Sequence, residues 1–489
     1  MRFAPILVFL VVLVGACTNP SCDLPNLDYS KLKSLKKAAF SEGPIGGLVL
    51  PNPIEATRNI AATATSADTL GALFGYNLPG LLSPQRLENE FLKIRIREIQ
   101  DSLTSLAKPD SSGRYLFGVS DAHYSEVLAY HSVETMKRYV EALGFPIVKT
   151  RPLYVLVRAK GSTANSADAN AVYDHGYLDP SAPRTMSFFG EGAFAPGEDR
   201  DIFWHEFGHL FNESVSAEVG IDSAGDNRAD FTQGSALHEC LADYLAETVS
   251  NKPYLGKWLA RNFPEIPQGQ PLRSAVDTGG RALTYDSVSL NRGRSPEKYA
   301  VAEWCTRVLW EVRTALQKKY DDKGSELSDR LVYSAVSLLT KDTSMRQFRD
   351  KLVEADQKLY CGENQDSIAQ AFSSRGFEDT PKPATSPLRL VANAVRSSDG
   401  VLAFQMTLTN PNQVTVRDVR VRLEALGGGI TPLAYMQGYG DFPAGGVVNI
   451  VPDLSVNAGI GATGNGIRYR LHVTSENAPE TVLSSEVAP

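Results

Sequence analysis

The sequence of 489 residues has few cysteines, few histidines and no run of basic residues. The formal net charge is −7, which together with the missing basic run argues against a nucleic-acid partner. Five cysteines are present, and none has the C-x-x-C spacing of a metal or redox site. Apolar residues make up 43% and charged residues 21%, as is typical of folded soluble proteins. The length predicts two or three domains.

The one strongly apolar run lies at the N-terminus, at residues 6–14, and is too short to span a membrane as a permanent helix. It ends in Val-Gly-Ala-Cys, which resembles a bacterial lipobox. The resemblance implies that residues 1–16 are a lipoprotein signal peptide and that Cys17 carries the lipid. Thr18 in place of an aspartate favours the outer membrane of the cell envelope. An ordinary secretory signal or a membrane anchor is the alternative.

Two of the seven histidines fall in one motif, H-E-x-x-H, at His205, Glu206 and His209. Side chains four apart on a helix share a face, so both imidazoles aim at one point and can bind a zinc ion. Glu206 lies beside them, within reach of a zinc-bound water. The surrounding sequence, residues 198–217, has no proline and predicts a helix. The alternative is an accidental match on an ordinary buried helix.

A catalytic zinc site usually takes a third protein ligand and leaves one position for water. The predicted helix at residues 234–249 offers Glu239 as that ligand. Asp243, one turn later, can accept a hydrogen bond from the far nitrogen of a zinc histidine and fix its tautomer. His238 is a rival ligand, although it points about 100° away from Glu239. The alternative is that Glu239 and Asp243 lie on a solvent-exposed face of the helix, as acidic residues usually do. Their apolar neighbours instead indicate a buried helix.

H-E-x-x-H followed by E-x-x-x-D resembles the glutamate-type zincins (gluzincins), the thermolysin and fungalysin group of zinc metallopeptidases, and is more similar to fungalysin. Asp201 matches the aspartate that precedes the motif in these families, and Glu303 to Glu311 resembles a fungalysin helix. The resemblance spans residues 113–377, with its elements in the family's order. It implies an α+β catalytic domain at residues 113–380, with a mixed β-rich lobe and a helical lobe on either side of the site.

The resemblance also implies substrate contacts. Asn170 and Ala171 match the edge strand that holds the substrate backbone in these families. The family's second electrophile, a histidine, is replaced here by Tyr299, which can still donate one hydrogen bond but is neutral. Tyr299 can equally be core or surface, and Tyr285 is a second candidate. The calcium-binding acids of thermolysin do not map cleanly onto this chain, so structural calcium stays open.

The rest of the chain predicts further segments. Residues 17–112 are expected to form a tether and irregular structure, with an amphipathic helix at residues 87–106. A strand is predicted at residues 153–158 and further helices at 300–320, 326–339 and 345–360. Cys240 and Cys305 both fall on predicted helices near the site and are the first candidates for a disulfide. Cys22 and Cys361 leave other pairings open.

A proline-rich linker is predicted at residues 381–387. After it the apolar pattern changes to a period of two, which predicts strands at residues 388–395, 401–408, 419–423, 447–451 and 467–473. Short alternating strands at this spacing indicate a β-sandwich at residues 388–489, similar to immunoglobulin-like accessory domains. This region has no catalytic constellation of its own.

The sequence therefore predicts a zinc-dependent endopeptidase that acts on peptides or proteins at the bacterial cell envelope, with Glu206 as the general base. The alternative is a zinc-bearing scaffold of weak or no activity that binds a surface polymer or protein through its C-terminal domain. An exopeptidase is disfavoured, because no G-x-M-E-N-like stretch for capturing a free amine is present.

Overall fold

The structure is a computed structural model. It describes residues 27–37, 40–69, 73–98, 106–147, 151–159, 170–174, 183–190, 194–216, 231–278, 282–340, 343–396, 401–426, 431–434, 436–450, 454–457 and 467–487. The predicted signal peptide, Cys17 and Cys22 lie outside these residues. Within them, no helix is both long and apolar enough to cross a membrane.

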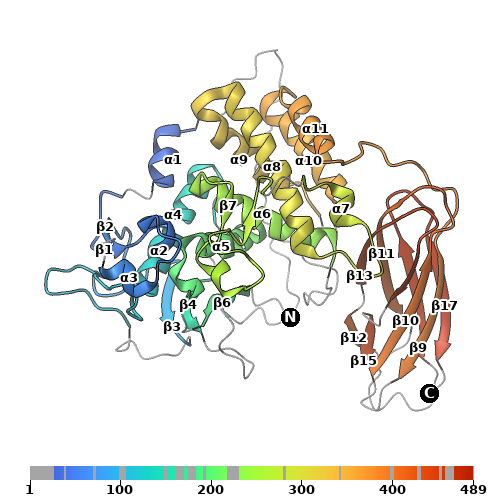
Figure 1. The fold of residues 1–489 in the computed structure, drawn as a ribbon, viewed down its shortest axis with the longest axis horizontal. Coiled ribbons are helices and arrows are strands. Elements are labelled where there is room, and N and C mark those ends of the chain that lie inside the picture. The colour runs from blue at the N-terminus through green and yellow to red at the C-terminus, as the bar shows by residue number, and fades with distance from the viewer. Residues whose placement is uncertain are drawn as a thin grey trace, which may run out of the picture.

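A four-stranded sheet has the strand order β3-β4-β6-β5, and its strands β3, β4 and β6 are labelled side by side in Figure 1. Strands β3 (Leu92–Ile96), β4 (Leu153–Ala159) and β6 (Arg184–Phe189) run parallel, and β5 (Asn170–Asp174) runs antiparallel at the edge. Helix α4 (Tyr124–Ala142) packs against β3, β4 and α5. This helix is buried along nearly its whole length, so the core of the domain surrounds it.

The helix predicted at residues 87–106 is wrong, because β3 occupies residues 92–96. Leu92 and Ile94 are buried, and Ile94 faces Val155 in the register with β4. The apolar residues of this stretch alternate with charged ones at a period of two, and isoleucine packs well in a sheet. Pairing with a neighbouring strand far along the chain therefore decided the local structure.

The segment before α4 is built from short elements that pack on the same core. They are α1 (Tyr29–Lys36), β1 (Ile45–Leu48), α2 (Pro53–Thr57), α3 (Ala64–Thr69) and β2 (Phe74–Asn77). Strands β1 and β2 pair antiparallel as a separate two-stranded sheet. Through these elements and β3, the stretch before residue 112 contributes to the core that supports the site.

Helices dominate the next part of the chain. They are α5 (Arg200–Val215), α6 (Gln233–Ser250), α7 (Tyr285–Ser289), α8 (Lys298–Tyr320), α9 (Gly324–Val336), α10 (Met345–Tyr360) and α11 (Gln365–Ser374). Two short strands, β7 (Tyr254–Leu255) and β8 (Arg273–Ser274), pair with each other, and three 3-10 turns, η1 (Pro196–Glu198), η2 (Leu259–Asn262) and η3 (Asp321–Lys323), join elements. The predicted helices are confirmed. A disulfide joins Cys240 on α6 to Cys305 on α8, as predicted.

In the described residues after 388, every secondary-structure element is a strand, and the strands form two antiparallel sheets. One contains β9 (Arg389–Arg396), β10 (Val401–Thr409), β12 (Thr431–Ala434), β14 (Val447–Ile450) and β15 (Ser455–Asn457); the other has the order β13 (Met436–Phe442), β11 (Val416–Ala425), β16 (Ile467–Thr474), β17 (Thr481–Val487). Phe404 from the first sheet and Tyr469 from the second meet in one apolar core. The strands predicted from the alternating pattern are confirmed.

The segment at residues 381–387 is hydrogen-bonded to the C-terminal sheets. Ala384 donates its backbone N–H to the carbonyl of Asn477, at 2.7 Å. The side chain of Asn412 both accepts from the backbone of Ser386 and donates to it, each at 2.9 Å. The segment therefore runs along the β region as part of its surface.

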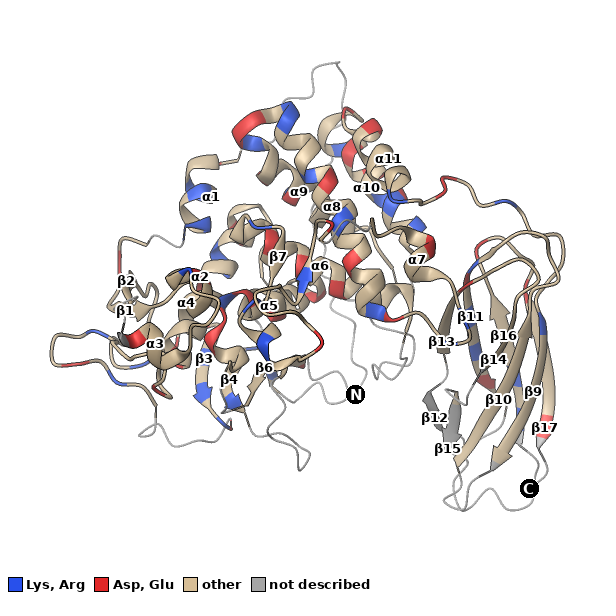
Figure 2. Cartoon of the chain, in the orientation of Figure 1, with Lys and Arg blue, Asp and Glu red and all other residues tan. Residues whose placement is uncertain are grey.

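Acidic and basic residues are interspersed along α8, α9 and α10 (Figure 2). Several of them pair between elements, as Arg375 does with Glu311 of α8, at 2.7 Å. Such pairs between partly exposed groups add little to stability, so the apolar core must supply most of it.

Glu198 is a buried carboxyl group outside the site that makes folding stability depend on pH. Its Oε2 accepts a hydrogen bond from the indole of Trp258, at 3.1 Å, and burial raises its pKa from 4.5 to about 7. Because its pKa is higher in the folded than in the unfolded state, Glu198 contributes stability that is fully present below the unfolded-state pKa of 4.5. This stability is lost as the pH rises through the folded-state pKa of about 7.

Glu198→Gln keeps an acceptor for Trp258 and removes the ionisation. We expect the difference in unfolding free energy between the variant and the wild type to grow in favour of the variant from pH 5 to pH 8, by up to about 3 kcal/mol. Urea unfolding at both pH values measures this. A difference in stability that is the same at pH 5 and pH 8 would contradict the role given to Glu198.

Candidate metal centre

Helix α5 supplies two histidines one turn apart. The helix begins after Asp199, whose side chain accepts a hydrogen bond from the backbone N–H of Asp201 and caps the first turn. His205 is buried and His209 half-buried, and their Nε2 atoms lie 3.1 Å apart. The two nitrogens therefore face one point, as the spacing of the motif predicts.

Helix α6 brings a carboxylate to the same point. It starts with a capping box between Thr232 and Ser235, which fixes where the helix begins. Further along, α6 crosses α5 at Gly208, where a Cβ atom would lie 2.6 Å from the Cα of Ala242. Because no side chain separates the helices there, Glu239 reaches the two histidines.

The separations of the three candidate ligand atoms fit a zinc ion. Oε2 of Glu239 lies 3.4 Å from Nε2 of His205 and 3.6 Å from Nε2 of His209. Ligands at roughly 2.0–2.1 Å in a tetrahedral zinc site stand about 3.3 Å from one another. In the part of the chain that the structure describes, these three residues form the one group of such side chains close enough to hold a metal.

Asp243 lies behind the first histidine. Its Oδ1 is 2.7 Å from Nδ1 of His205, the nitrogen that faces away from Glu239. Arg273 of β8 binds both oxygens of Asp243, through Nε at 2.6 Å and Nη2 at 2.8 Å. Although burial opposes it, Arg273 holds the pKa of Asp243 below its usual value. An ionised Asp243 accepts a hydrogen bond from Nδ1–H of His205, which keeps the proton on Nδ1 and leaves Nε2 free to bind a metal.

Lys298, at the start of α8, holds the other oxygen of Glu239. Its Nζ lies 3.1 Å from Oε1, while Oε2 faces the two histidines. The carboxylate of Glu239 is therefore oriented with one oxygen toward the lysine and one toward the candidate metal position.

His238, the rival ligand, lies beside the second histidine. Its Nδ1 is 2.7 Å from Nδ1 of His209, and the two rings are nearly parallel, with an interplanar angle of 13°. Nε2 of His209 faces Glu239, and the group of side chains close enough to hold a metal contains Glu239, while His238 lies at the outer nitrogen of His209.

Glu206 lines the same cleft and is almost fully buried. Burial raises its pKa to about 7, and the neighbouring His205 partly offsets this. The backbone N–H of Tyr173 on β5 contributes a hydrogen bond to the carboxylate. A carboxyl group with a pKa near neutrality can take up and return a proton at physiological pH.

The cleft has a volume of about 260 Å³. Residues 170–173 of β5 line it together with α5, α6 and the start of α8. Since β5 ends the strand order, its outer edge has no strand partner among the described residues. Asn170 is exposed, and its side-chain oxygen accepts from the N–H of Ala171 at 2.9 Å. The two residues predicted to hold substrate therefore lie at the cleft.

The two tyrosine candidates lie in different surroundings. Tyr299 lines the cleft with 41% of its surface exposed. Nζ of Lys298 lies 4.7 Å from the centre of its ring, and Cζ of Arg273 lies 5.2 Å from it. Tyr285 is buried, and its hydroxyl accepts a hydrogen bond from Gln233 at 2.8 Å. Tyr285 is therefore part of the core and away from the cleft.

Sequence reasoning missed Arg273 and Lys298 as members of the site. Lys298 directly precedes Tyr299 and begins the same helix, so its position next to a candidate was a usable signal. Arg273 lies in a strand of two residues with no periodic pattern, and only the folded chain brings it to Asp243.

Comparison with known proteins agrees with this geometry. Residues 193–379 match the family described as fungalysin metallopeptidase (M36). The matched segment contains α5 and α6, and it supports a zinc metallopeptidase, a hydrolase, as the class of this part of the chain.

Two curated relatives are the extracellular metalloproteinase MEP of Neosartorya fischeri and the extracellular metalloproteinase mep of Aspergillus fumigatus. The first is 26% identical over 212 residues and the second 25% over 207 residues, each match covering 39% of this chain. The chain spans 31% of the length of each relative. Among solved structures, the precursor of protealysin, a metalloproteinase from Serratia proteamaculans, is 16% identical with a TM-score of 0.41, over 67% of this chain and 99% of that one.

The close approach of α5 and α6 can be tested with Gly208→Ala. The added methyl group would collide with the backbone of Ala242, so we expect the helices to separate by several tenths of an ångström. Alanine is favoured over glycine in a helix by about 1 kcal/mol, yet we expect a net loss of stability together with a weaker hold on zinc. Thermal unfolding and zinc content after dialysis measure the two effects.

Gly234→Ala in α6 is the matched control. Its Cβ would meet only atoms at 3.7 and 3.8 Å, which is ordinary contact. We expect unchanged zinc content and equal or higher stability. Full zinc retention by Gly208→Ala would show that this helix contact does not determine the geometry of the candidate metal site.

Proposed function

We propose that this chain is a zinc-dependent endopeptidase. The observation that carries the proposal is the spacing of Nε2 of His205, Nε2 of His209 and Oε2 of Glu239, which fits tetrahedral zinc beside a buried carboxyl group and an open strand edge. The family match over residues 193–379 supports the same class of activity.

Zinc bound by these residues would supply a Lewis acid that polarises a peptide carbonyl and activates water. Glu206 takes the proton from that water as the general base and returns it to the leaving amine. Asp243 keeps the proton of His205 on Nδ1, so that Nε2 remains a ligand.

The substrate is proposed to bind as an extended strand along the outer edge of β5. A strand edge without a strand partner presents backbone groups that a peptide can pair with. Asn170 and Ala171 begin this edge at the cleft. Such binding depends on the peptide backbone and leaves the choice of side chain to the other walls of the cleft.

Tyr299 is proposed to donate a hydrogen bond to the oxyanion that forms at the attacked carbon. The phenol is neutral, where the histidine of the resembled families carries charge. Lys298 and Arg273 stand next to its ring and supply positive charge in this corner of the cleft.

The chain is further proposed to be an exported lipoprotein that is anchored through Cys17 at the cell envelope, with the outer membrane as its destination. The lipobox-like sequence supports this, and the curated relatives are named extracellular. The two C-terminal sheets around one core support an immunoglobulin-like accessory domain.

Glu206→Gln tests the general base. We expect hydrolysis of unfolded protein to fall by about 10²–10⁴-fold, because the amide cannot accept the proton, while zinc content stays unchanged. Glu213→Gln is the matched control, since Glu213 lines the same cleft from the same helix. Activity retained in Glu206→Gln would rule out the proposed role of this residue.

Tyr299→Phe tests the oxyanion donor. We expect kcat to fall by about 10²–10³-fold with KM and zinc content little changed, because the hydrogen bond is needed mainly in the transition state. Steady-state kinetics on one peptide provide both constants. A kcat equal to that of the wild type would mean that another group binds the oxyanion.

The second candidate function is a zinc-bearing scaffold that binds a surface polymer or protein with little or no hydrolysis. Tyr299 favours it, since a neutral donor replaces a charged one. A broad peptide library separates the two: zinc-dependent cleavage at defined bonds supports the peptidase, and no cleavage supports the scaffold.

A further inference from the structure

Strand β13 is an edge strand that the rest of the molecule covers. It ends the order β13-β11-β16-β17, yet all seven of its residues are buried. Helix α7 and the segments next to it cover the open edge (Figure 1). An edge strand normally needs protection from unwanted pairing. Here the catalytic part of the same chain provides it.

The first contact of β13 is with the residues that lead into α6. The backbone N–H of Gly438 donates to the carbonyl of Phe231, at 2.8 Å. Phe231 precedes Thr232, the N-cap of α6, and the helix then carries Glu239. A Cβ on Gly438 would lie 2.8 Å from the Phe231 carbonyl oxygen, so the two backbones touch directly.

The second contact is with the segment between α7 and α8. Asn291 donates its backbone N–H to the carbonyl of Asp441 and its side-chain amide to the carbonyl of Tyr439, both at 2.8 Å. The hydroxyl of Ser289 donates to Oδ2 of Asp441, also at 2.8 Å. A Cβ on Gly440 would lie 2.3 Å from the Ser289 carbonyl oxygen and from Cγ of Pro296. This segment ends at α8.

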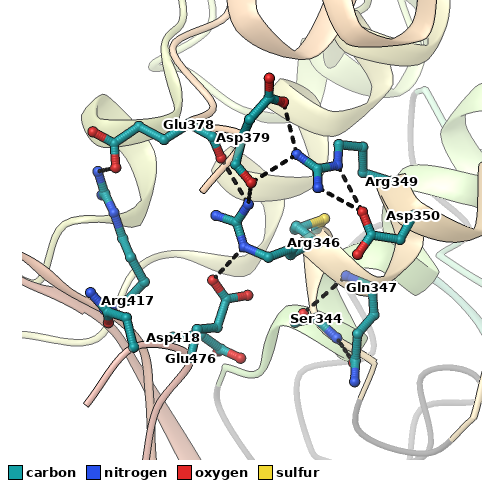
Figure 3. Close-up of polar contacts among 12 residues, drawn as sticks. Ser344, Arg346, Gln347, Arg349, Asp350, Glu378, Asp379, Arg417, Asp418 and Glu476 are labelled. Atoms are coloured by element: carbon teal, nitrogen blue, oxygen red, sulfur yellow. Dashed lines mark hydrogen bonds and ion pairs between the residues drawn. The ribbon is translucent and has the colours of Figure 1, made fainter. Parts of the chain in front are cut away.

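Two arginines form ion pairs between the C-terminal sheets and the helical part of the chain (Figure 3). Arg417 on β11, whose side chain is 7% exposed, pairs with Asp286 of α7 at 2.6 Å, Asp441 at 2.8 Å and Glu378 at 3.3 Å. Arg346 of α10 pairs with Glu476 at 3.0 Å. Its Nη1 also donates to the carbonyl groups of Glu378 and Asp379, at 2.8 and 2.5 Å. The pairs link α7, α10 and the end of the helical part to the β sheets.

We infer that β13 positions the starts of α6 and α8, so that the C-terminal sheets help to hold the residues of the site in place. The inference rests on the proposed function, because it assigns the two positioned helices the ligand Glu239 and the donor Tyr299. Glu239 lies two helical turns after Thr232, which Gly438 touches, and Tyr299 lies three residues after Pro296, whose ring Gly440 approaches. A displacement of such a group by about 1 Å can lower the reaction rate by a large factor.

Gly440→Ala tests the contact that leads to α8. We expect kcat on a peptide to fall by about 10–100-fold with KM little changed, because Tyr299 is displaced. Gly445→Ala is the matched control: the two glycines have φ of +70° and +66°, so both variants carry the same backbone strain, but no atom lies within 4 Å of the new Cβ at Gly445. Equal kinetics in the two variants would overturn the inference for α8.

A double variant separates positioning from general damage. In a Tyr299→Phe background, Gly440→Ala should cause no further loss of kcat, since the group that it displaces is already gone. Losses that multiply would show that Gly440 acts independently of Tyr299 and would overturn the inference for α8. Ser289→Ala, which removes one hydrogen bond to Asp441, replaces Gly440→Ala in the same cycle if that variant does not fold.

Gly438→Ala tests the contact that leads to α6 without any assay of peptidase activity. Its Cβ would press on the Phe231 carbonyl, so we expect the full-length protein to release zinc to a chelator about tenfold faster than Gly234→Ala. Unchanged release would overturn the inference for α6. A wild type that binds zinc but cleaves no peptide would contradict the proposed function. The rate of zinc release would still test whether β13 positions the start of α6.

Discussion

The contact between α5 and α6 at Gly208 and Ala242 is the constraint on which the site depends. Two helices supply three candidate ligand atoms, and these converge only if the helix axes come closer than ordinary side chains permit. The disulfide from Cys240 to Cys305 adds a covalent link next to Glu239, and it ties α6 to α8. Glu239, its partner Lys298 and Tyr299 are thereby held on two helices that are joined to each other.

Charge pairing makes so polar a site compatible with burial. An unpaired buried charge costs several kcal/mol, but the buried acids Asp243 and Glu239 each face a cation. Arg273 binds Asp243 through two nitrogens, and Lys298 binds Glu239. The same pairs fix the directions in which the ligand lone pairs point. Groups that are already oriented need no reorganisation when charge develops during a reaction, and this is how such sites accelerate reactions.

Much of the fold could be predicted from local patterns. The helix that holds His205 and His209 and the alternating strands after residue 400 follow from residue spacing within single elements. The helix predicted around Leu92 is wrong, because a partner strand some 60 residues away sets the structure of this stretch. Arg273 could not be predicted for a similar reason: its role comes from Asp243 on another element.

The docking of β13 was also beyond the sequence. An accessory sandwich after a proline-rich segment reads as a separate unit, since nothing local marks the surface that it will contact. Gly438 and Gly440 look like ordinary turn residues in the sequence. Only the folded chain shows that each allows a close backbone approach to the segments before α6 and α8.

X-ray absorption at the zinc edge of the metal-loaded protein tests the central claim most directly. It counts the imidazole ligands, and so it separates Glu239 from His238 as the third ligand. We predict one zinc per chain with two imidazole nitrogens, one carboxylate oxygen and one solvent oxygen at about 2.0–2.1 Å. Three imidazoles, or a protein that binds no zinc, would contradict the claim that α5 and α6 form a catalytic metal centre.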